Sequence, residues 1–354
     1  MIEIRSFEGT PEELSEFVVS AWKSTYEGRM VVPHWSADYF RWQLRLDQPG
    51  SEKQVLCAYE GTQPVGVIAH VPMTMEMAGE QFPATQASWL SVPAEYRGRG
   101  IATVLTDGSR EFLRQEQYRF KVGYRYFGSS ASLGSKFWRP QRQTTTTFAR
   151  KMGFWIRVLN PTRAGNWNLN RWEGRLTRTA APVLGLHSLR HPPGVVIRPF
   201  QPADLPRCLE LANLATADCD LKLVWTAERL GHQLGLHGFG QSLVAEVNGQ
   251  VQGCIGYHLL PMLGRSLENM GILDLMFVSE LPSGIRTELL NSVLLRLQQD
   301  NAVVALKLRG GDYPASTFLR WGWVWKPADS HALVTWANGV QPIPRLRKLH
   351  LLWR

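Results

Sequence analysis

The sequence is poor in cysteine and has no cysteine pair spaced as in a metal or redox site. Its 354 residues include four cysteines, none of them in a CxxC arrangement, namely Cys57, Cys208, Cys219 and Cys254. Such scattered cysteines predict buried free thiols in a reducing compartment, not a disulfide framework or a zinc site. We therefore expect no metal cofactor and a cytoplasmic protein.

Long apolar segments are missing as well. No apolar run approaches the roughly 18 residues that a membrane-spanning helix needs. The first residues, Met1–Phe7, read as a strand and lack the apolar core of a signal peptide. We expect no stable membrane insertion. The length predicts two globular domains, and a hydrophobic content of 44% is ordinary for a chain with sizeable cores.

The common nucleotide-binding loops are absent, but another glycine-rich loop is present. There is neither a Gly-Lys-Ser/Thr loop nor a Gly-x-Gly-x-x-Gly motif followed by an acidic residue. Residues 84–92 predict a buried strand, and residues 99–116 predict a helix with apolar residues at helical spacing. The connection between them contains the run Arg97-Gly98-Arg99-Gly100-Ile101-Ala102.

A glycine-rich loop at a helix N-terminus is suited to binding phosphate. The first-turn amides have no partner within the helix, and the helix dipole adds partial positive charge there. Gly98 and Gly100 permit backbone angles that turn several N–H groups into one concavity. Arg97 and Arg99 would place positive charge at its edge. The alternative is an ordinary strand-to-helix turn with incidental arginines.

The Arg-x-x-Gly-x-Ala spacing, after a strand that ends Leu90-Ser91-Val92-Pro93, resembles motif A of the GNAT superfamily of N-acyltransferases. The resemblance implies that the loop binds the pyrophosphate of coenzyme A, with acetyl-CoA or another acyl-CoA as the acyl donor. The residues that it implies for cofactor binding are Leu90, Ser91, Val92, Arg97, Gly98, Arg99, Gly100, Ile101, Ala102, Ser129 and Ser130.

The order of the expected elements resembles the GNAT fold over residues 1–152. These elements are a strand at 2–7, helices at 10–26 and 36–46, strands at 54–60, 64–71 and 84–92, a helix at 99–116, a strand at 118–124, a short helix near 130–138 and a strand near 143–151. The expected fold class is α/β (α+β), with two tandem GNAT-like domains, each a twisted mixed β-sheet flanked by helices.

The pattern restarts at residue 195, which indicates an internal repeat. Val195–Phe200 echoes Ile2–Phe7, and later strands and helices follow in the same order, at 242–248, 251–259, 269–278, 285–299, 303–308 and 315–323. The second loop, Leu281–Thr287, keeps only Gly284 and lacks the spacing of the first. We therefore predict that the N-terminal copy binds coenzyme A and is catalytic, and that the C-terminal copy is degenerate.

The predicted boundaries are 1–152 for the N-terminal domain, 153–194 for a basic and aromatic linker helix, 195–338 for the degenerate domain and 339–354 for a basic amphipathic tail. The linker interleaves tryptophans with arginines, a composition that also occurs at single-stranded nucleic acid or membrane surfaces. We favour a linker whose aromatics are packed and whose arginines reach solvent. The tail is expected to pack back on the protein.

The net charge of +9 is unevenly distributed. Residues 1–194 hold 24 Lys and Arg against 17 Asp and Glu, whereas residues 195–354 hold 15 against 13. The positive charge therefore collects on the half with the loop, as a polyanionic cofactor would favour. Because no nucleic-acid recognition motif accompanies it, we expect no nucleic-acid partner. An acidic acyl-carrier protein as a partner, and a homodimer as the oligomeric state, stay open as possibilities.

Acyl transfer from a thioester to an amine requires a polarised carbonyl, a neutral amine and a protonated leaving thiolate. The resemblance implies that the backbone amide of Leu90 contacts the thioester oxygen. An amine with a pKa of about 10.4 must also lose a proton. Polar residues expected on the acceptor side are Glu27, His34, His70 and Glu76, and we select Glu27 and His70 as candidate bases.

The usual general acid of the family is missing from this sequence. The family places a tyrosine on the late helix, where this chain has Phe137 or Trp138. Tyr124 and Tyr126, at the end of the preceding strand, are the substitutes that we consider. Protonation of the thiolate by water is the alternative.

The sequence thus predicts a coenzyme A-dependent N-acyltransferase, most simply one that transfers acetyl to a primary amine of a small molecule or peptide. Two alternatives stay open. Positive charge and 14 tryptophans suggest longer acyl chains or an acyl-carrier donor, and the missing tyrosine suggests a non-catalytic acyl-CoA-binding protein.

Overall fold

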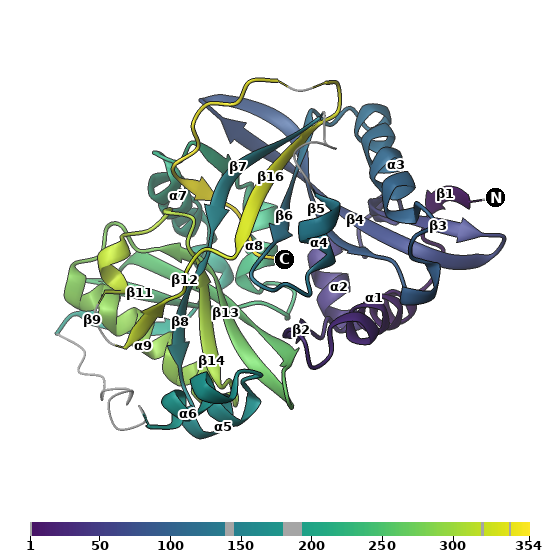
Figure 1. Ribbon diagram of the computed structural model, residues 1–354. Coiled ribbons are helices and arrows are strands. Elements are labelled where there is room, and N and C mark those ends of the chain that lie inside the picture. The colour runs from purple at the N-terminus through teal and green to yellow at the C-terminus, as the bar shows by residue number, and fades with distance from the viewer. Residues whose placement is uncertain (1, 139–144, 180–192, 320–321, 340) are drawn as a thin grey trace. The chain divides into compact units, whose positions relative to one another are not determined.

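The computed structural model describes residues 2–138, 145–179, 193–319, 322–339 and 341–354 (Figure 1). They form two compact units. The first contains residues 1–151, 329–346 and 354, and the second contains residues 152–328 and 347–353. Each unit is built on one mixed sheet.

In the sequence of the first unit, helices α1 and α2 precede β3, helix α3 lies between β5 and β6, and helix α4 follows β6. Its elements are β1 (Ile2–Ser6), α1 (Pro11–Tyr26), β2 (Val32–Pro33), α2 (Ala37–Leu44), β3 (Val55–Glu60), β4 (Gln63–Met77), β5 (Glu80–Ser91), α3 (Ile101–Gln115), β6 (Phe120–Tyr126), α4 (Leu133–Phe137), β7 (Thr146–Met152) and β16 (Ser330–Trp336). The sheet order is β1-β3-β4-β5-β6-β16-β7. Strand β5 runs parallel to β6, whereas the pairs β1–β3, β3–β4, β4–β5 and β6–β16 are antiparallel.

Local sequence explains where these helices begin. Thr10 caps α1 in a complete capping box with Glu13, and Pro11 occupies the first turn. Ser36 caps α2 through its side chain. Helix α3 differs, because its cap is Gly100 and no side chain satisfies its first amides.

Helices cover both faces of the first sheet. On one face, α3 packs Ile101, Leu105 and Phe112 against β3 and β4. The fit is close, since a Cβ at Gly66 would lie 2.8 Å from the side chains of Ile101 and Leu105. On the other face, the Trp89 ring packs on Phe40 of α2, with centroids 5.3 Å apart.

The second unit repeats this plan. Its elements are β8 (Phe154–Val158), α5 (Pro161–Trp167), α6 (Arg171–Thr179), β9 (Val195–Pro199), α7 (Leu205–Thr216), β10 (Leu221–Leu223), α8 (Ala227–Leu234), β11 (Gln241–Val247), β12 (Gln250–Leu263), β13 (Leu267–Phe277), α9 (Ser283–Gln299), β14 (Val304–Leu308), β15 (Trp323–Trp325) and β17 (Leu349–His350). The sheet order is β15-β8-β14-β13-β12-β11-β9. Short 3₁₀ turns in the two units lie at Ser51–Gln54, Ala94–Tyr96, Pro202–Asp204 and Ala315–Thr317.

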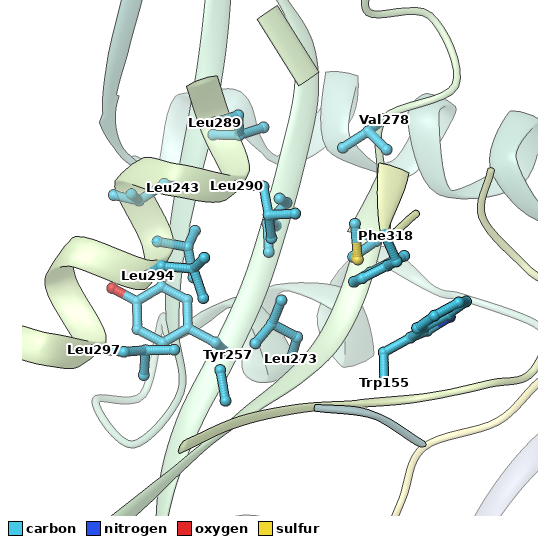
Figure 2. Close-up of a cluster of buried hydrophobic side chains, with 14 of the residues drawn as sticks. Trp155, Leu243, Tyr257, Leu273, Val278, Leu289, Leu290, Leu294, Leu297 and Phe318 are labelled. Atoms are coloured by element: carbon cyan, nitrogen blue, oxygen red, sulfur yellow. The ribbon is translucent and has the colours of Figure 1, made fainter. Parts of the chain in front are cut away.

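The core of the second unit lies between α9 and its sheet (Figure 2). Leucines of α9, among them Leu289, Leu294 and Leu297, pack with Tyr257 of β12. At the end of this cluster the Trp155 ring stacks on Phe318 with centroids 5.5 Å apart and planes 8° apart.

The two sheets have the same strand order, which confirms the tandem arrangement. Strands β1-β3-β4-β5-β6 of the first sheet correspond to β9-β11-β12-β13-β14 of the second. In both sheets the next strand comes from the other half of the chain. Strand β16, near the end of the sequence, pairs with β6, and β8, from the first half, pairs with β14.

The compact units therefore differ from the predicted domain boundaries. Residues 154–158, expected in a linker helix, form β8, because the run Phe-Trp-Ile-Arg-Val, apolar except for Arg157, finds backbone partners in β14. Residues 330–336, assigned to the degenerate domain, belong to the first sheet. The rest of the predicted linker forms α5 and α6 up to Thr179, and its stretch 180–192 lies outside the described residues.

Two smaller predictions have different outcomes. In the stretch 315–323, where a late helix is expected, the described residues form the 3₁₀ turn Ala315–Thr317 and the start of β15 at Trp323, and residues 320–321 lie outside the described residues. The tail packs back as expected, since β17 pairs in parallel with β10, and Leu351 and Leu352 are buried. Among the described residues, no helix combines the length and the apolar character needed to cross a membrane.

Candidate functional site

Strands β5 and β6 separate just before the glycine-rich loop. Their parallel ladder joins only Ala84–Gln86 to Phe120–Val122. The separation begins at Gly123, where a Cβ would lie 3.2 Å from the carbonyl oxygen of Ala87. From Ala87 to Ser91, β5 still pairs with β4 but not with β6. One backbone edge of β5 is therefore left for another partner.

A β-bulge interrupts β5 at the same place. Val67 pairs with Ser91 and Ala69 with Ser88, so Trp89 and Leu90 together oppose Ile68. Trp89 has a φ of +57°, a left-handed conformation that costs a non-glycine residue roughly 1 kcal/mol or more. Burial of its ring, which is 4% exposed, offsets this cost. The bulge removes Leu90 from the ladder with β4.

Side chains from α1 and β5 hold the bulge. The indole N–H of Trp22 donates to Ser91 Oγ at 2.9 Å, and the Ser91 hydroxyl donates to the carbonyl of Trp89 at 3.0 Å. The Trp22 ring packs edge-on against Trp35 with centroids 5.1 Å apart. Since Ser91 is buried, this hydrogen-bonded chain fixes the backbone on both sides of Leu90.

Beyond the bulge, the chain enters the loop and α3. Gly98 and Gly100 have φ values of +77° and +79°, and a Cβ at either position would meet no atom within 4 Å. In the part of the chain that the structure describes, no hydrogen bond occupies the amides of residues 98–102. The first turn of α3 carries no acidic residue. The loop therefore presents free N–H groups to open space at a positive helix end.

The side chains of both loop arginines interact with other protein groups, whereas the sequence predicts that both lie free at the edge of the anion site. The Arg97 guanidinium donates to the Val92 carbonyl at 3.1 Å and to the Thr25 hydroxyl. It thereby joins the loop to α1. Arg99 forms an ion pair with Glu60, whose carboxylate raises the pKa of Arg99. Backbone amides therefore carry more of the anion site than the sequence suggests.

The two candidate tyrosines lie on β6, past the point of separation. Because side chains alternate along a strand, Tyr124 and Tyr126 share the face opposite to Lys121, which points toward α3. The loop after β6 holds Ser129 and Ser130. The Ser129 hydroxyl accepts from the amide of Ala131 at 3.2 Å, and Ser130 is exposed.

The candidate bases have very different surroundings. Glu27 caps the C-terminal end of α1, is exposed, and lies 4.0 Å from the ammonium of Lys23. His34 is also exposed, and Glu76 is half-buried on β4. His70 is 0% exposed, on the sheet face that α3 covers. The prediction that His70 faces an acceptor amine is wrong, because α3 seals it from solvent.

His70 instead belongs to a buried chain of polar side chains. Its Nδ1 lies 3.1 Å from Thr85 Oγ1 and its Nε2 lies 2.9 Å from Ser109 Oγ. The ammonium of Lys121 donates to the same Ser109 hydroxyl. Burial lowers the pKa of Lys121 to about 7, and burial followed by the Lys121 charge holds the pKa of His70 well below its ordinary value.

The sequence interpretation missed the aromatic residues at the end of α1. Trp22 and Tyr26 stand four residues apart, so they share one face of the helix. The Tyr26 hydroxyl accepts from the amide of Leu133 at 3.3 Å and joins α1 to α4. Burial raises the pKa of Tyr26, against the effects of the Leu133 hydrogen bond and the Arg97 charge. The i,i+4 spacing was the available signal.

The second loop lacks the features of the first. Gly284 lies inside α9, and the amide of Leu281 donates to the Val278 carbonyl at 3.2 Å. The Arg286 guanidinium donates to the carbonyls of Val278 and Leu281 at 3.2 and 2.9 Å. The loop is thus closed by its own hydrogen bonds.

The second sheet has a similar opening, but protein side chains fill it. Asp274 is the extra residue of a bulge between β12 and β13, and β13 pairs with β14 only up to Leu306. The next residue, Lys307, is buried and donates to the Asp274 carbonyl at 2.8 Å. The Asp274 carboxylate accepts from His258 Nδ1 at 2.6 Å.

Comparison with known families gives one match. The family described as acetyltransferase (GNAT) domain matches residues 9–132, which include β5, the glycine-rich loop and α3. No curated protein matches the chain.

Solved structures resemble the chain over both units. N-myristoyltransferase of Saccharomyces cerevisiae with bound myristoyl-CoA is 15% identical, with a TM-score of 0.71 over 94% of this chain and 82% of that one. A GCN5-related N-acetyltransferase from Anabaena variabilis is 11% identical, with a TM-score of 0.56 over 96% and 73% of the two chains. A probable N-acyltransferase from Enterococcus faecalis is 10% identical, with a TM-score of 0.52 over 94% and 72%. At these identities the likeness shows the fold.

Proposed function

We propose that the chain is a coenzyme A-dependent N-acyltransferase, because residues 9–132 match a GNAT acetyltransferase domain and the two units share the fold of N-myristoyltransferase. The observation that carries the proposal is the separation of β5 from β6 at a bulge that leads directly into the glycine-rich loop. It provides an unpaired strand edge next to a set of free amides, as an extended thioester that ends in a pyrophosphate requires.

The donor would bind along this edge and loop. The amide groups of the pantetheine arm pair with the backbone of residues 87–92, in the manner of an added strand. The pyrophosphate accepts from the amides of residues 98–102 at the N-terminus of α3. Arg97 acts by holding the loop against α1. Arg99 would bind the phosphates only if it left its ion pair with Glu60.

The amide of Leu90 would polarise the thioester carbonyl. Leu90 lies outside the β4 ladder, and the chain from Trp22 through Ser91 to the Trp89 carbonyl fixes its orientation. A preorganised backbone donor aimed at a developing oxyanion contributes a few kcal/mol to catalysis. Attack of a neutral amine on the carbonyl carbon forms the amide bond, and the C–S bond breaks to release the thiol.

Two proton transfers complete the reaction. Glu27 remains the proposed base for the amine, acting through water, since its carboxylate is exposed at the end of α1. Tyr124 and Tyr126 remain the proposed acids for the thiolate, because β6 carries both beside the opening. His70 has no part in this proposal, since it is buried under α3.

Acetyl-CoA is the simplest donor, with a primary amine of a small molecule or peptide as the acceptor. Longer acyl chains form a second candidate. The likeness to the N-myristoyltransferase, with a TM-score of 0.71, exceeds that to the acetyltransferase, with 0.56. A thiol-release assay with acyl-CoAs of increasing length, run against a panel of amines and peptides, separates the two donors. Binding of acyl-CoA without thiol release would favour the non-catalytic alternative.

The loop assignment is tested by Gly100→Glu. A carboxylate placed at the free amides should abolish binding of coenzyme A in calorimetry while circular dichroism stays that of the folded protein. Gly79→Glu is the matched control, because Gly79 also has a positive φ, of +84°, and no atom within 4 Å of a Cβ. It should bind normally. Unchanged affinity in a folded Gly100→Glu protein would overturn the proposal.

A further inference from the structure

Helix α6 packs against its neighbour α5 in the second unit (Figure 1). The two helices cross at glycines, since a Cβ on Gly174 would lie 2.3 Å from the carbonyl oxygen of Gly165. Helix α5 is anchored in turn, because the Trp167 indole donates to the Met262 carbonyl at 2.9 Å. The position of α6 is therefore set by packing on one of its faces.

The opposite face of α6 carries large apolar side chains in solvent. Trp172 is 72% exposed and Leu176 is 67% exposed. They are four residues apart, so they lie on one side of the helix. The interpretation of this segment as one with packed aromatics is therefore wrong for Trp172. Neighbouring large apolar side chains exposed on one helix face and rimmed by polar residues are typical of an interaction surface.

Positive charge lies beside this apolar pair, although Arg178 itself turns toward α5, where its guanidinium donates to Asn166 Oδ1 at 2.9 Å. Helix α6 contains Arg171, Arg175 and Arg178 and one acid, Glu173. The Arg175 guanidinium lies 5.4 Å from the centroid of the Trp172 ring. The Glu173 carboxylate accepts from the amide side chains of Asn168 and Asn170, both at 3.2 Å.

The neighbouring hairpin tip between β12 and β13 adds another cation. Arg265 donates to the carbonyl of Leu169, just before α6, at 3.2 Å. Arg175 thus lies at the Trp172 ring, and Arg171 and Arg265 add positive charge at the start of α6, against a single acid.

We propose that the Trp172–Leu176 face of α6 is a peripheral docking surface for an anionic lipid membrane. An indole and an aliphatic side chain on one helix face enter the boundary between headgroups and acyl chains, while arginines around them bind lipid phosphates. Charge complementarity selects anionic lipid, since each cation near such a surface adds to binding. The contact is superficial and reversible, because it uses two side chains and no spanning segment.

This chemistry favours lipid over a nucleic acid or a protein. Single-stranded nucleic acid binds through a basic groove with several stacking rings, whereas here one indole stands beside a leucine that has no stacking function. A second protein would bury more than two apolar side chains in a stable interface. Nucleic acid therefore becomes an outcome of the test.

The test is cosedimentation of the full-length protein with vesicles. Vesicles of phosphatidylcholine with about one third phosphatidylserine should bind it, and phosphatidylcholine alone should not. Trp172→Ser with Leu176→Ser should weaken binding at least about tenfold, and Arg171→Gln with Arg175→Gln should remove its dependence on phosphatidylserine. Leu214→Ser is the matched control, because Leu214 is 53% exposed on α7, and it should bind as the wild type does.

The substituted side chains are exposed, so all variants should fold, and circular dichroism verifies this. Failure of the wild type to sediment with anionic vesicles overturns the proposal. So does equal binding by the Trp172→Ser, Leu176→Ser protein. Tighter binding to a single-stranded oligonucleotide, lost in the same variant and without vesicle binding, would assign the surface to nucleic acid instead. None of these outcomes depends on acyltransferase activity.

Discussion

A buried lysine lies beside a buried histidine in the first unit. Lys121 is 3% exposed, and its ammonium donates to Ser109, which also contacts His70. Burial, with a smaller contribution from the Arg110 charge, lowers the pKa of Lys121 to about 7, while Asp107 acts in the opposite direction. Unfolding restores the ordinary value of about 10.4. Lys121 thus couples the stability of this unit to pH.

Lys121→Met is expected to change how stability depends on pH. Between pH values of about 7 and about 10.4 the unfolded chain binds a proton at Lys121 that the folded chain does not bind. Lys121 therefore makes the free energy of unfolding of the wild type increase as pH rises through that window, by at most about 1.4 kcal/mol per pH unit. The variant lacks this gain. Below a pH of about 7 both states are protonated, and the contribution is flat.

Urea unfolding at several pH values measures this difference. The stability of the wild type relative to Lys121→Met should rise between neutral and alkaline pH. Lys53→Met is the control, because Lys53 is exposed and pairs with Glu116 at 3.2 Å at the surface. Parallel curves for the wild type and Lys121→Met would show that Lys121 keeps an ordinary pKa in the fold.

The positions of single side chains were the least predictable part of the site. The sequence did not indicate on which face of the sheet a polar side chain would lie, and His70 lies on the buried face under α3. Arg97 looked like a free charge in the sequence but donates to Val92 and Thr25. Both outcomes depend on contacts between distant elements, which a local motif does not contain.

At the scale of elements, local patterns were sufficient for most helices and strands. The capping residues Thr10 and Ser36 mark the starts of α1 and α2, and glycines mark the start of α3. The separation of β5 from β6 and the bulge at Trp89 were not visible in the residues, because alternation in a strand predicts a continuous ladder. The short ladder between β5 and β6 shows the separation directly.

Trp22→Phe tests whether α1 orients the bulge. Phenylalanine keeps a ring against Trp35 but removes the donor to Ser91. On the proposed mechanism, turnover should fall by roughly tenfold, while the dissociation constant for coenzyme A stays the same, because a small misplacement of the Leu90 amide affects the transition state most.

Steady-state kinetics and calorimetry measure the two quantities. Ser91→Ala should show the same loss, and the double variant should be no worse than either single one, since both break one hydrogen-bonded chain. Full turnover by Trp22→Phe would exclude a positioning role.

The unequal loops predict one coenzyme A site per chain. The second loop is closed by Arg286 and by the bond between Leu281 and Val278, and Lys307 fills the opening of its sheet. A calorimetric titration should reach a stoichiometry of one. Arg286→Ala should leave that value unchanged, whereas Gly100→Glu should reduce it to zero. Two equivalent sites would show that the second copy has kept its function.

At the scale of the whole molecule, the main path of each sheet includes one strand from the other half of the chain, β16 in the first sheet and β8 in the second. The repeat itself was readable, because Val195–Phe200 echoes Ile2–Phe7 and the later elements follow in order. The placement of β8 and β16 was not, since each looks like the next strand of the half in which it occurs. Pairing over such sequence distances carries no local signal. Each sheet consequently depends on residues from both halves.

This dependence predicts that the N-terminal half cannot stand alone. A chain ending at Pro192 retains the glycine-rich loop but lacks β16, which pairs with β6 from Phe120 to Tyr126. It also leaves β8 without β14 and β15. Unpaired strand edges with apolar residues aggregate, so residues 1–192 should be insoluble or inactive toward acceptor. Coexpression with residues 193–354 should restore a soluble complex on gel filtration. If residues 1–192 alone were soluble and turned over acceptor at the full-length rate, neither β16 nor the second unit would be needed for catalysis.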